Sequence, residues 1–175
     1  YDSVKDVFWA SGAALFVRRE LYLEVGGLDA SFFAHQEEID LCWRLLNMNY
    51  KIACIPQSTV FHLGGASLDK MNPKKTFLNF RNNLVMLLKN LPVYALPIIF
   101  IRMVFDGVAG VKFISEGKFS HCWAIVKAHF SFYSRIPSVL LNRKKTIKIS
   151  NSLMYSKSIL VEYFIKKNKT YSSLN

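Results

Sequence analysis

The stretch that decides the fold is residues 32–44, FFAHQEEIDLCWR. Its apolar positions repeat at i, i+3, i+4 and i+7, the spacing of a helix with one buried stripe. These positions are Ile39, Cys42, Trp43 and Leu46. Glu37 and Glu38 fall in the first turn, where the helix dipole stabilises negative charge. The stretch therefore predicts a helix that begins near Gln36 with an acidic start.

Two interpretations of this acidic start remain open. Glu37 and Glu38 differ by about 100° around the helix axis, so one can face a cleft while the other faces protein. Acidic residues are favoured at helix N-termini for structural reasons alone. The same dipole keeps a carboxylate ionised at neutral pH, which is the state that a general base needs. Asp40 and Arg44, four residues apart, are interpreted as a structural ion pair.

The segments around this helix predict a mixed α and β organisation for residues 1–90. Residues 7–18 indicate a strand or loop that leads into a short helix. Residues 50–56 (YKIACIP) and 58–65 (STVFHLGG) predict two short strands bounded by proline and glycine. Residues 76–91 have the apolar spacing of a helix. The first half is therefore expected to hold one α/β unit.

The charge is unevenly divided between the two halves of the chain. Residues 1–90 hold 10 Lys or Arg and 9 Asp or Glu, a net charge of +1, whereas residues 91–175 hold 13 and 3, a net charge of +10. The apolar runs in the second half are too rich in Phe, Ile, Leu and Val for a solvated groove. We therefore expect this half to face an anionic membrane surface, and nucleic acid is disfavoured as a partner.

The second half, residues 91–175, is expected to be a basic, apolar, helical region associated with a membrane. Residues 93–114 are about as long as a bilayer-spanning helix of ~20 residues, and both crossing the bilayer and lying in its interface remain open. Residues 152–169 mix apolar residues with lysine, which favours an amphipathic helix. A soluble helical subdomain that packs on the first half is the alternative.

The cysteines and His62 bear on the cellular compartment and on a candidate metal site. The three cysteines have no paired spacing, which fits a reducing compartment. His62 stands at the end of a predicted strand, 24 residues after Glu38 and just before Gly64-Gly65. A lone histidine at such a place is more often a satisfied polar residue than a metal ligand, and H-E-x-x-H is absent. His62 becomes a candidate metal ligand only when it is taken together with the other motifs of the chain as one pattern.

That pattern resembles a known family. SGAALFVRRE (11–20), GGLDASFFAHQEEIDLCWR (26–44), YKIACIP and VFHLGG (60–65) resemble, in order and approximate spacing, the second half of a family 2 glycosyltransferase of the inverting GT-A type. Members from bacterial surface-polysaccharide pathways look most similar. The resemblance covers residues 1–90 well and the basic half loosely. As a set these motifs are specific, although each one alone is weak.

The resemblance implies a fold and an activity. The fold class would be α/β: the C-terminal half of a GT-A (Rossmann-like) domain in residues 1–90, followed by the membrane-associated helical region. The activity would be transfer of a sugar from a nucleotide-sugar donor to a hydroxyl of a glycan or lipid-linked acceptor, with inversion. A divalent metal, Mn²⁺ or Mg²⁺, would assist. The location would be the cytoplasmic face of the bacterial inner membrane.

The resemblance also assigns roles to residues of this chain. The family's acidic pair is usually Glu-Asp with the second member as base; here the pair is Glu37-Glu38, which puts the base on Glu38 and makes its carboxylate one methylene longer. His62 would bind the metal. Asp40 and Arg44 would support the scaffold. The substrate-binding positions would be Ser11, Gly12, Ala13 and His35.

The family's Asp-x-Asp motif, which holds the metal and the donor phosphates, does not occur in these 175 residues. We therefore expect it to precede residue 1 in a longer enzyme, and we expect these residues alone to be inactive. A second hypothesis, from a different class, is a membrane-anchored interaction or scaffold module without catalysis. In that case the acidic cluster would be only the start of a helix.

Overall fold

The computed structural model describes residues 2–63, 72–143, 153–155, 157–159 and 161–170. Its α-helices are α1 (Arg19–Glu24), α2 (Glu37–Asn47), α3 (Pro73–Asn90), α4 (Pro97–Ser115) and α5 (Phe119–Leu141). Shorter helical turns are η1 (Gly12–Ala14), η2 (Ala30–Phe32), η3 (Val93–Ala95) and a π-type turn, η4 (Val161–Ile165). The strands β1 (Lys5–Asp6) and β2 (Ala53–Cys54) pair in antiparallel fashion.

The helices predicted from apolar spacing are confirmed. α2 begins at Glu37, one residue after the predicted start. α3 begins three residues before the predicted 76–91, because Asn72 caps it. The Asn72 side chain accepts a hydrogen bond from the backbone N–H of Lys74 at 2.9 Å, and Pro73 occupies the first helical position, where its missing N–H costs nothing.

The predicted strands are much shorter than expected. Of residues 50–56, only Ala53–Cys54 form a strand, and residues 58–63 form none. Gly64-Gly65, the end of the second predicted strand, lie outside the described residues. The side chains of Phe61 and Leu63 are 98% and 82% exposed, so the apolar residues of this segment are not buried against the rest of the protein. The Rossmann-like fold class stays a prediction, since one two-stranded ladder neither builds nor excludes such a sheet.

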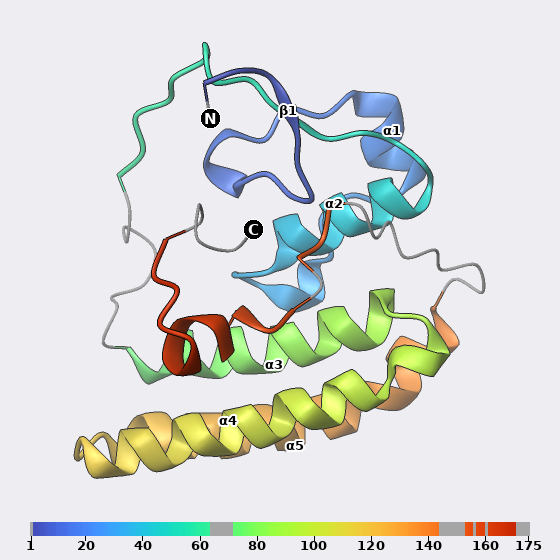
Figure 1. Ribbon diagram of the computed structural model, residues 1–175. Coiled ribbons are helices and arrows are strands. Elements are labelled where there is room, and N and C mark those ends of the chain that lie inside the picture. The colour runs from blue at the N-terminus through green and yellow to red at the C-terminus, as the bar shows by residue number, and fades with distance from the viewer. Residues whose placement is uncertain (1, 64–71, 144–152, 156, 160, 171–175) are drawn as a thin grey trace.

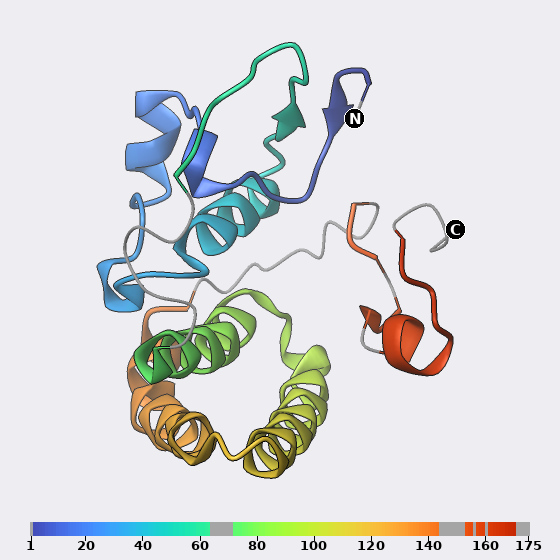
Figure 2. The same ribbon diagram turned by 90° about the vertical axis from the view of Figure 1, so that its left-hand side faces the viewer.

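The helices form a layer beneath the N-terminal segments (Figures 1 and 2). α5 packs against both α3 and α4, while α2 packs on the other side of α3. The main core joins these parts: Phe32 and Trp43 of the N-terminal segments pack with Leu84 of α3 and Phe132 of α5. α3 therefore lies between the acidic helix α2 and the α4–α5 hairpin.

The C-terminal segment departs from the predicted amphipathic helix over 152–169. Its described residues contain only the π-type turn η4. Glu162, 3% exposed, accepts hydrogen bonds from Lys166 Nζ and Asn168 Nδ2, both at 2.8 Å. The backbone carbonyl of Glu162 also accepts from Asn168 N–H, which closes the turn. These contacts close the chain into a turn over residues 162–168.

Candidate functional site

The acidic start of α2 follows a loop with an unusual backbone. Phe33, His35 and Gln36 have φ angles of 65°, 69° and 76°, in a region that side-chain-bearing residues rarely adopt. Each such residue costs of the order of 1–3 kcal/mol and persists only where the surroundings enforce it. The loop that presents Glu37 and Glu38 is therefore held in a conformation that it would not adopt alone.

Asn82 of α3 enforces this conformation. Its side chain is almost completely buried, and its Nδ2 donates to the backbone carbonyls of Phe32, Ala34 and His35 at 3.0, 2.8 and 2.8 Å. One amide thus satisfies three carbonyls of the strained loop. Buried carbonyls without such a donor would each carry a desolvation cost.

Arg81 orients this amide. Its Nε donates to Asn82 Oδ1 at 2.8 Å, while its Nη2 donates to the carbonyls of Ser31 and Phe32, both at 3.1 Å. Burial, followed by repulsion from Arg135, lowers the pKa of Arg81 to about 10, so the guanidinium stays cationic at neutral pH. The fork geometry of arginine suits this simultaneous contact with a side chain and two carbonyls.

The carboxylate of Glu38 lies half-buried beside Gly12 of η1. A Cβ placed on Gly12 would stand 3.8 Å from Glu38 Cβ, so the predicted segment Ser11–Ala13 and the predicted base are neighbours. Burial, and then repulsion from Glu37, raises the pKa of Glu38. The backbone N–H of Glu38 and the nearby His35 partly oppose this rise. A higher pKa makes the ionised carboxylate a stronger proton acceptor.

Three polar atoms at the start of α2 are buried without a hydrogen-bond partner. They are Oε2 of Glu38, Oε2 of Glu37 and Nε2 of His35. Buried side-chain polar atoms are nearly always paired in folded proteins, so a group of unpaired ones calls for an explanation. A ligand with hydroxyl groups would supply the missing partners. The arrangement can accept a proton from such a hydroxyl.

The remaining substrate-binding candidates lie on the rim of this site. Ser11 and Ala13 are exposed, and Ser11 Oγ accepts a hydrogen bond from the backbone N–H of Ala13 at 3.3 Å, which stabilises the start of η1. His35 lies in the strained loop, and its carbonyl is the one bound by Asn82. The structure thus brings Gly12, His35, Glu37 and Glu38 together at one end of α2.

His62 is placed differently. It is exposed in the extended segment that follows β2, and within the described residues it makes no hydrogen bond to Glu38. No group of three or more His, Cys, Asp or Glu side chains in the described parts of the chain could hold a metal ion. The described residues therefore do not form a complete metal site, and the roles predicted for His62 and for Mn²⁺ or Mg²⁺ stay predictions.

Asp40 and Arg44 form the ion pair expected from their spacing, but in a buried network. Arg44 Nε donates to Asp40 Oδ2 at 2.9 Å, and the Asp40 side chain is 0% exposed. Lys89 Nζ donates to the same oxygen at 2.8 Å, and Asn90 Nδ2 donates to Asp40 Oδ1 at 2.7 Å. Arg44 also donates to the carbonyls of Val25 and Gly27. The network fastens α2 to α3 and to the Gly26-Gly27 turn.

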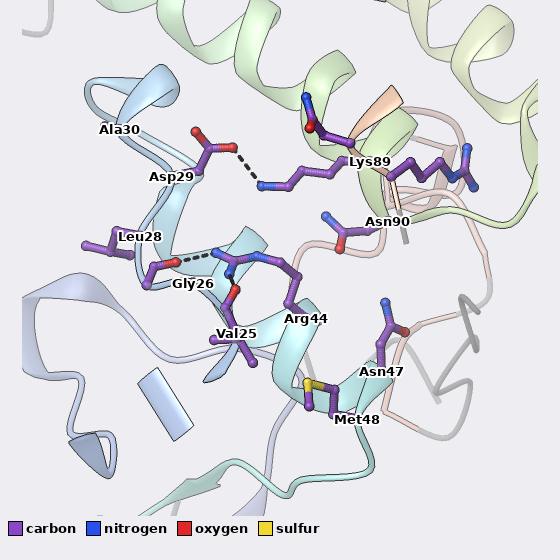
Figure 3. Close-up of a pocket in the computed structure, with 13 residues that line it drawn as sticks. Val25, Gly26, Leu28, Asp29, Ala30, Arg44, Asn47, Met48, Lys89 and Asn90 are labelled. Atoms are coloured by element: carbon purple, nitrogen blue, oxygen red, sulfur yellow. Dashed lines mark hydrogen bonds and ion pairs between the residues drawn. The ribbon is translucent and has the colours of Figure 1, made fainter. Parts of the chain in front are cut away.

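A pocket of about 400 Å³ lies beside this network (Figure 3). Arg44 and Asn47 from α2 and Lys89 from α3 point toward it, and Lys89 Nζ pairs with Asp29 Oδ2 at 2.7 Å. Arg44 lies six residues after Glu38, about 240° around the helix, so the pocket faces away from Glu38. Of the residues predicted from sequence, only Arg44 is among its described lining residues.

The sequence analysis missed the polar residues of α3 that build both networks. Asn82 and Asn90 are buried at 1% and 2% exposure. They are eight residues apart, which places them within about a quarter turn of each other on one helix. Two asparagines on the apolar side of a helix are a signal for a buried polar role. The spacing alone, however, does not name their partners.

Comparison with known proteins yields a partial match. Over 60 residues the chain is 37% identical to N-acetylglucosaminyl-diphospho-decaprenol L-rhamnosyltransferases of two Mycobacterium tuberculosis strains, CDC 1551 / Oshkosh and ATCC 25618 / H37Rv. The match covers 34% of this chain and spans 20% of the length of each relative. No protein-family model and no solved structure matches the chain. At this coarse level, the similarity is to a glycosyltransferase that acts on a lipid-linked sugar.

Proposed function

We propose that this chain is part of an inverting glycosyltransferase of family 2, GT-A type, and that Glu38 is its general base. The observation that carries the proposal is the half-buried carboxylate of Glu38, whose Oε2 has no hydrogen-bond partner. A strained loop and two side chains of α3 nevertheless hold this carboxylate in place. The partial similarity to L-rhamnosyltransferases supports the class of reaction.

The proposed mechanism uses the residues that meet at the start of α2. A hydroxyl of the acceptor donates a hydrogen bond to Glu38 Oε2 and passes its proton there. As it does so, its oxygen bonds to the anomeric carbon of the donor sugar, and the bond from that carbon to the nucleoside diphosphate breaks. Glu37 raises the basicity of Glu38 through charge repulsion. Gly12 leaves the side of Glu38 open, because a side chain there would stand against it. His35 Nε2, also without a partner, is positioned to hydrogen-bond a further hydroxyl.

The proposal extends to the partners and the location. The donor would be a nucleotide sugar and the acceptor a glycan or a lipid-linked sugar, in synthesis of a bacterial surface polysaccharide. The relatives' name specifies a diphospho-decaprenol-linked acceptor, which agrees in kind. The basic helical half would hold the protein at the cytoplasmic face of the inner membrane. A divalent metal would offset charge on the departing diphosphate.

The test is to replace Glu38 with glutamine in the protein that carries these residues and to measure sugar transfer from a panel of nucleotide sugars to prenyl-diphosphate-linked N-acetylglucosamine. Loss of a general base lowers turnover about 10²–10⁴-fold. Glu20→Gln is the matched control, because Glu20 also lies in the first turn of a helix but is exposed. We expect the control to transfer at the native rate.

Turnover in the Glu38→Gln variant equal to that of the control would remove Glu38 from the mechanism. The absence of transfer with every donor, in native protein that folds and binds membranes, would favour the scaffold hypothesis. The pH profile adds a second readout. Because the pKa of Glu38 is raised, activity should decline on the acid side at a higher pH than an ordinary glutamate, with its value of 4.5, would give.

A further inference from the structure

The outward face of α4 is almost entirely apolar. Its exposed side chains include Ile98, Phe100, Ile101, Val104, Val108 and Val111. They span about 160° of the helix circumference at 100° per residue, an arc in which Lys112, near the C-terminal end of the helix, is the exposed charged side chain. Exposed apolar patches of this extent mark interaction surfaces in folded proteins. The segment Val93–Ser115 has a mean hydropathy of 1.6 and only 22% of it is buried, so by length and composition it would suit a bilayer.

The charged residues in the middle of α4 are turned away from this face. Asp106 is 0% exposed and pairs with Arg102 Nη2 at 3.0 Å and with His129 Nε2 of α5 at 3.1 Å. The Arg102 guanidinium also lies over the ring of Phe80 of α3, 5.5 Å from its centroid. Arg102 and Asp106 of α4 thus pair with each other and face α3 and α5, and the apolar side chains on the opposite side remain for another partner.

The second helix of the hairpin adds an amphipathic stripe. Phe119, Trp123 and Phe130 of α5 are 66%, 60% and 69% exposed. Lys127, also exposed, lies beside them on the same helix. Aromatic rings and lysine stems are the side chains that prefer the boundary between lipid headgroups and acyl chains. The helices are joined at a charged tip, where Lys118 pairs with Glu116 at 2.7 Å.

The position of α3 decides how the hairpin can meet a membrane. α3 packs along α5 and runs in the same general direction as both hairpin helices (Figures 1 and 2). If α4 crossed the bilayer, α3 would be carried to the same depth. α3 bears Lys74, Lys75, Arg81 and Lys89, and a charged side chain at the bilayer centre costs at least about 2.5–3.5 kcal/mol. A crossing arrangement is therefore strongly disfavoured.

We propose that the α4–α5 hairpin lies flat in one leaflet of an anionic bilayer, with the outward face of α4 inserted among the acyl chains and α3 on the aqueous side. Residues 91–175 carry a net charge of +10, which complements anionic headgroups. A second copy of the chain is a poorer occupant, because pairing two such faces would bring two strongly basic halves together. The inference rests on the proposed membrane association and is independent of the transfer reaction.

The first experiment measures co-sedimentation of the chain with vesicles of phosphatidylglycerol and phosphatidylcholine, and with vesicles of phosphatidylcholine alone. The test variant, Val104→Glu with Val111→Glu, places two charges on the exposed face. The control, Gln57→Glu with Ser58→Glu, makes the same charge change at exposed positions outside the hairpin. We expect the test variant to bind anionic vesicles at least tenfold more weakly than native protein, and the control to stay within twofold.

The second experiment measures oriented circular dichroism of the native chain in stacked anionic bilayers. Because α3, α4 and α5 run together, the flat arrangement predicts the spectrum of helices parallel to the membrane surface. A spectrum of helices along the membrane normal would overturn the inference. Failure of the native chain to bind anionic vesicles would also overturn it, as would a native dimer in solution that the test variant abolishes.

The Glu38→Gln variant separates this inference from the proposed function. We expect it to bind vesicles as native protein does, since Glu38 lies in α2 and outside the hairpin. Lost transfer with retained binding supports both proposals. Retained binding with unchanged transfer contradicts only the role of Glu38. Lost binding in the Val104→Glu, Val111→Glu variant supports insertion of the outward face of α4 whatever the outcome for transfer, and the oriented spectrum decides whether the hairpin lies flat.

Discussion

On one face of α2, Asp40 is completely buried and both of its oxygens accept hydrogen bonds, whereas Glu38, two residues earlier, has a buried oxygen without a partner. The two carboxylates share a helix and a sequence motif. Their surroundings separate them: three donors from α2 and α3 converge on Asp40, and a glycine lies beside Glu38. The comparison distinguishes a carboxylate that holds the fold together from one that is left available for a ligand.

The largest expected effect on stability comes from Asp40. Asp40→Ala leaves the Lys89 ammonium and the Arg44 guanidinium near each other without the shared anion, and breaking a buried pair in this way costs about 3–5 kcal/mol. Urea unfolding at pH 7 measures this loss. Asp6→Asn is the control, because Asp6 pairs with Lys51 only at 4.0 Å on an exposed surface. If Asp40→Ala lowered the unfolding free energy by less than about 1 kcal/mol, Asp40 would not be the stabilising carboxylate that the comparison with Glu38 requires.

The next effect concerns Asn82, which holds the loop that precedes Glu38. Asn82→Ala removes the donor for three carbonyls, that of Phe32 in a buried bond and those of Ala34 and His35 in part-buried bonds, and the loss of such hydrogen bonds costs about 2–3 kcal/mol in unfolding free energy. Turnover should fall as well, because the loop with positive φ angles loses the contact that enforces it. Asn79→Ala is the matched control, since Asn79 bonds only the carbonyl of Lys75 in its own helix. Normal transfer in a folded Asn82→Ala protein would contradict this role.

A smaller effect is expected at Asp29, which shares Lys89 with Asp40. Burial acts to raise the pKa of Asp29, but the hydrogen bonds and charge of Lys89, with Ser31, lower it to about 2. An acid with a lowered pKa stabilises the fold above its unfolded value of 3.8 and loses this contribution as the pH falls toward 2. Asp29→Asn should therefore cost about 1 kcal/mol at pH 7, given its partial exposure.

This cost of Asp29→Asn should shrink as the pH of the unfolding experiment falls from 4 to 3, because the Asp29 carboxyl of the unfolded chain takes up protons near its pKa of 3.8 while the native carboxylate stays mostly ionised. A cost that does not change with pH would mean that the Asp29–Lys89 contact contributes nothing specific. Asp40→Ala measured over the same range shows whether the neighbouring network itself responds to acid.

The smallest effect is on the stability contributed by Glu38. Its pH dependence has the opposite sign to that of Asp29. Because the pKa of Glu38 is raised above 4.5, the folded protein binds more protons than the unfolded chain between 4.5 and the raised value. Stability from this group is thus present below pH 4.5 and is lost as the pH rises through that window. Glu38→Gln does not titrate, so its stability relative to native protein should increase from pH 4 to pH 7.

The opposite pH dependences expected for Asp29 and Glu38 give the sharpest test of whether Glu38 lacks a partner. Removal of the Asp29 charge should matter most at neutral pH, whereas removal of the Glu38 charge should relieve a penalty there. If Glu38→Gln became less stable relative to native protein as the pH rose, the carboxylate would have a partner in solution. The argument for a ligand-binding role would then fail.

The sequence predicted what depends on local spacing. The apolar period of residues 39–46 predicted α2, and the period of residues 76–91 predicted α3 with the wrong start, because the cap at Asn72 lies before the periodic positions. The spacing of Asp40 and Arg44 predicted their ion pair but not its burial. That burial depends on Lys89 and Asn90, about 50 residues away in sequence, which no local pattern connects to Asp40.

Expectations that depend on partners distant in the sequence were wrong for one predicted strand and stay predictions for the metal site. Residues 58–63 hold β-branched and aromatic side chains that favour a strand, yet no neighbouring strand pairs with them in the described structure. Gly12 and Glu38, which the resemblance named separately, are neighbours, while the polar atoms that hold the loop come from α3. The roles assigned to Gly12 and Glu38 in transfer stay predictions. The roles of His62 and of a divalent metal stay predictions.

The amide of Asn82 has a consequence for how the chain can be divided. Every residue assigned a role in transfer lies before residue 63, so a shortened protein ending ahead of α3 would retain the whole set in its sequence. It would lack the one side chain that satisfies three carbonyls of the strained loop. The acidic pair would then be present but misplaced, which means that the segment with the candidate site residues is not separable from the helix that rests on the hairpin.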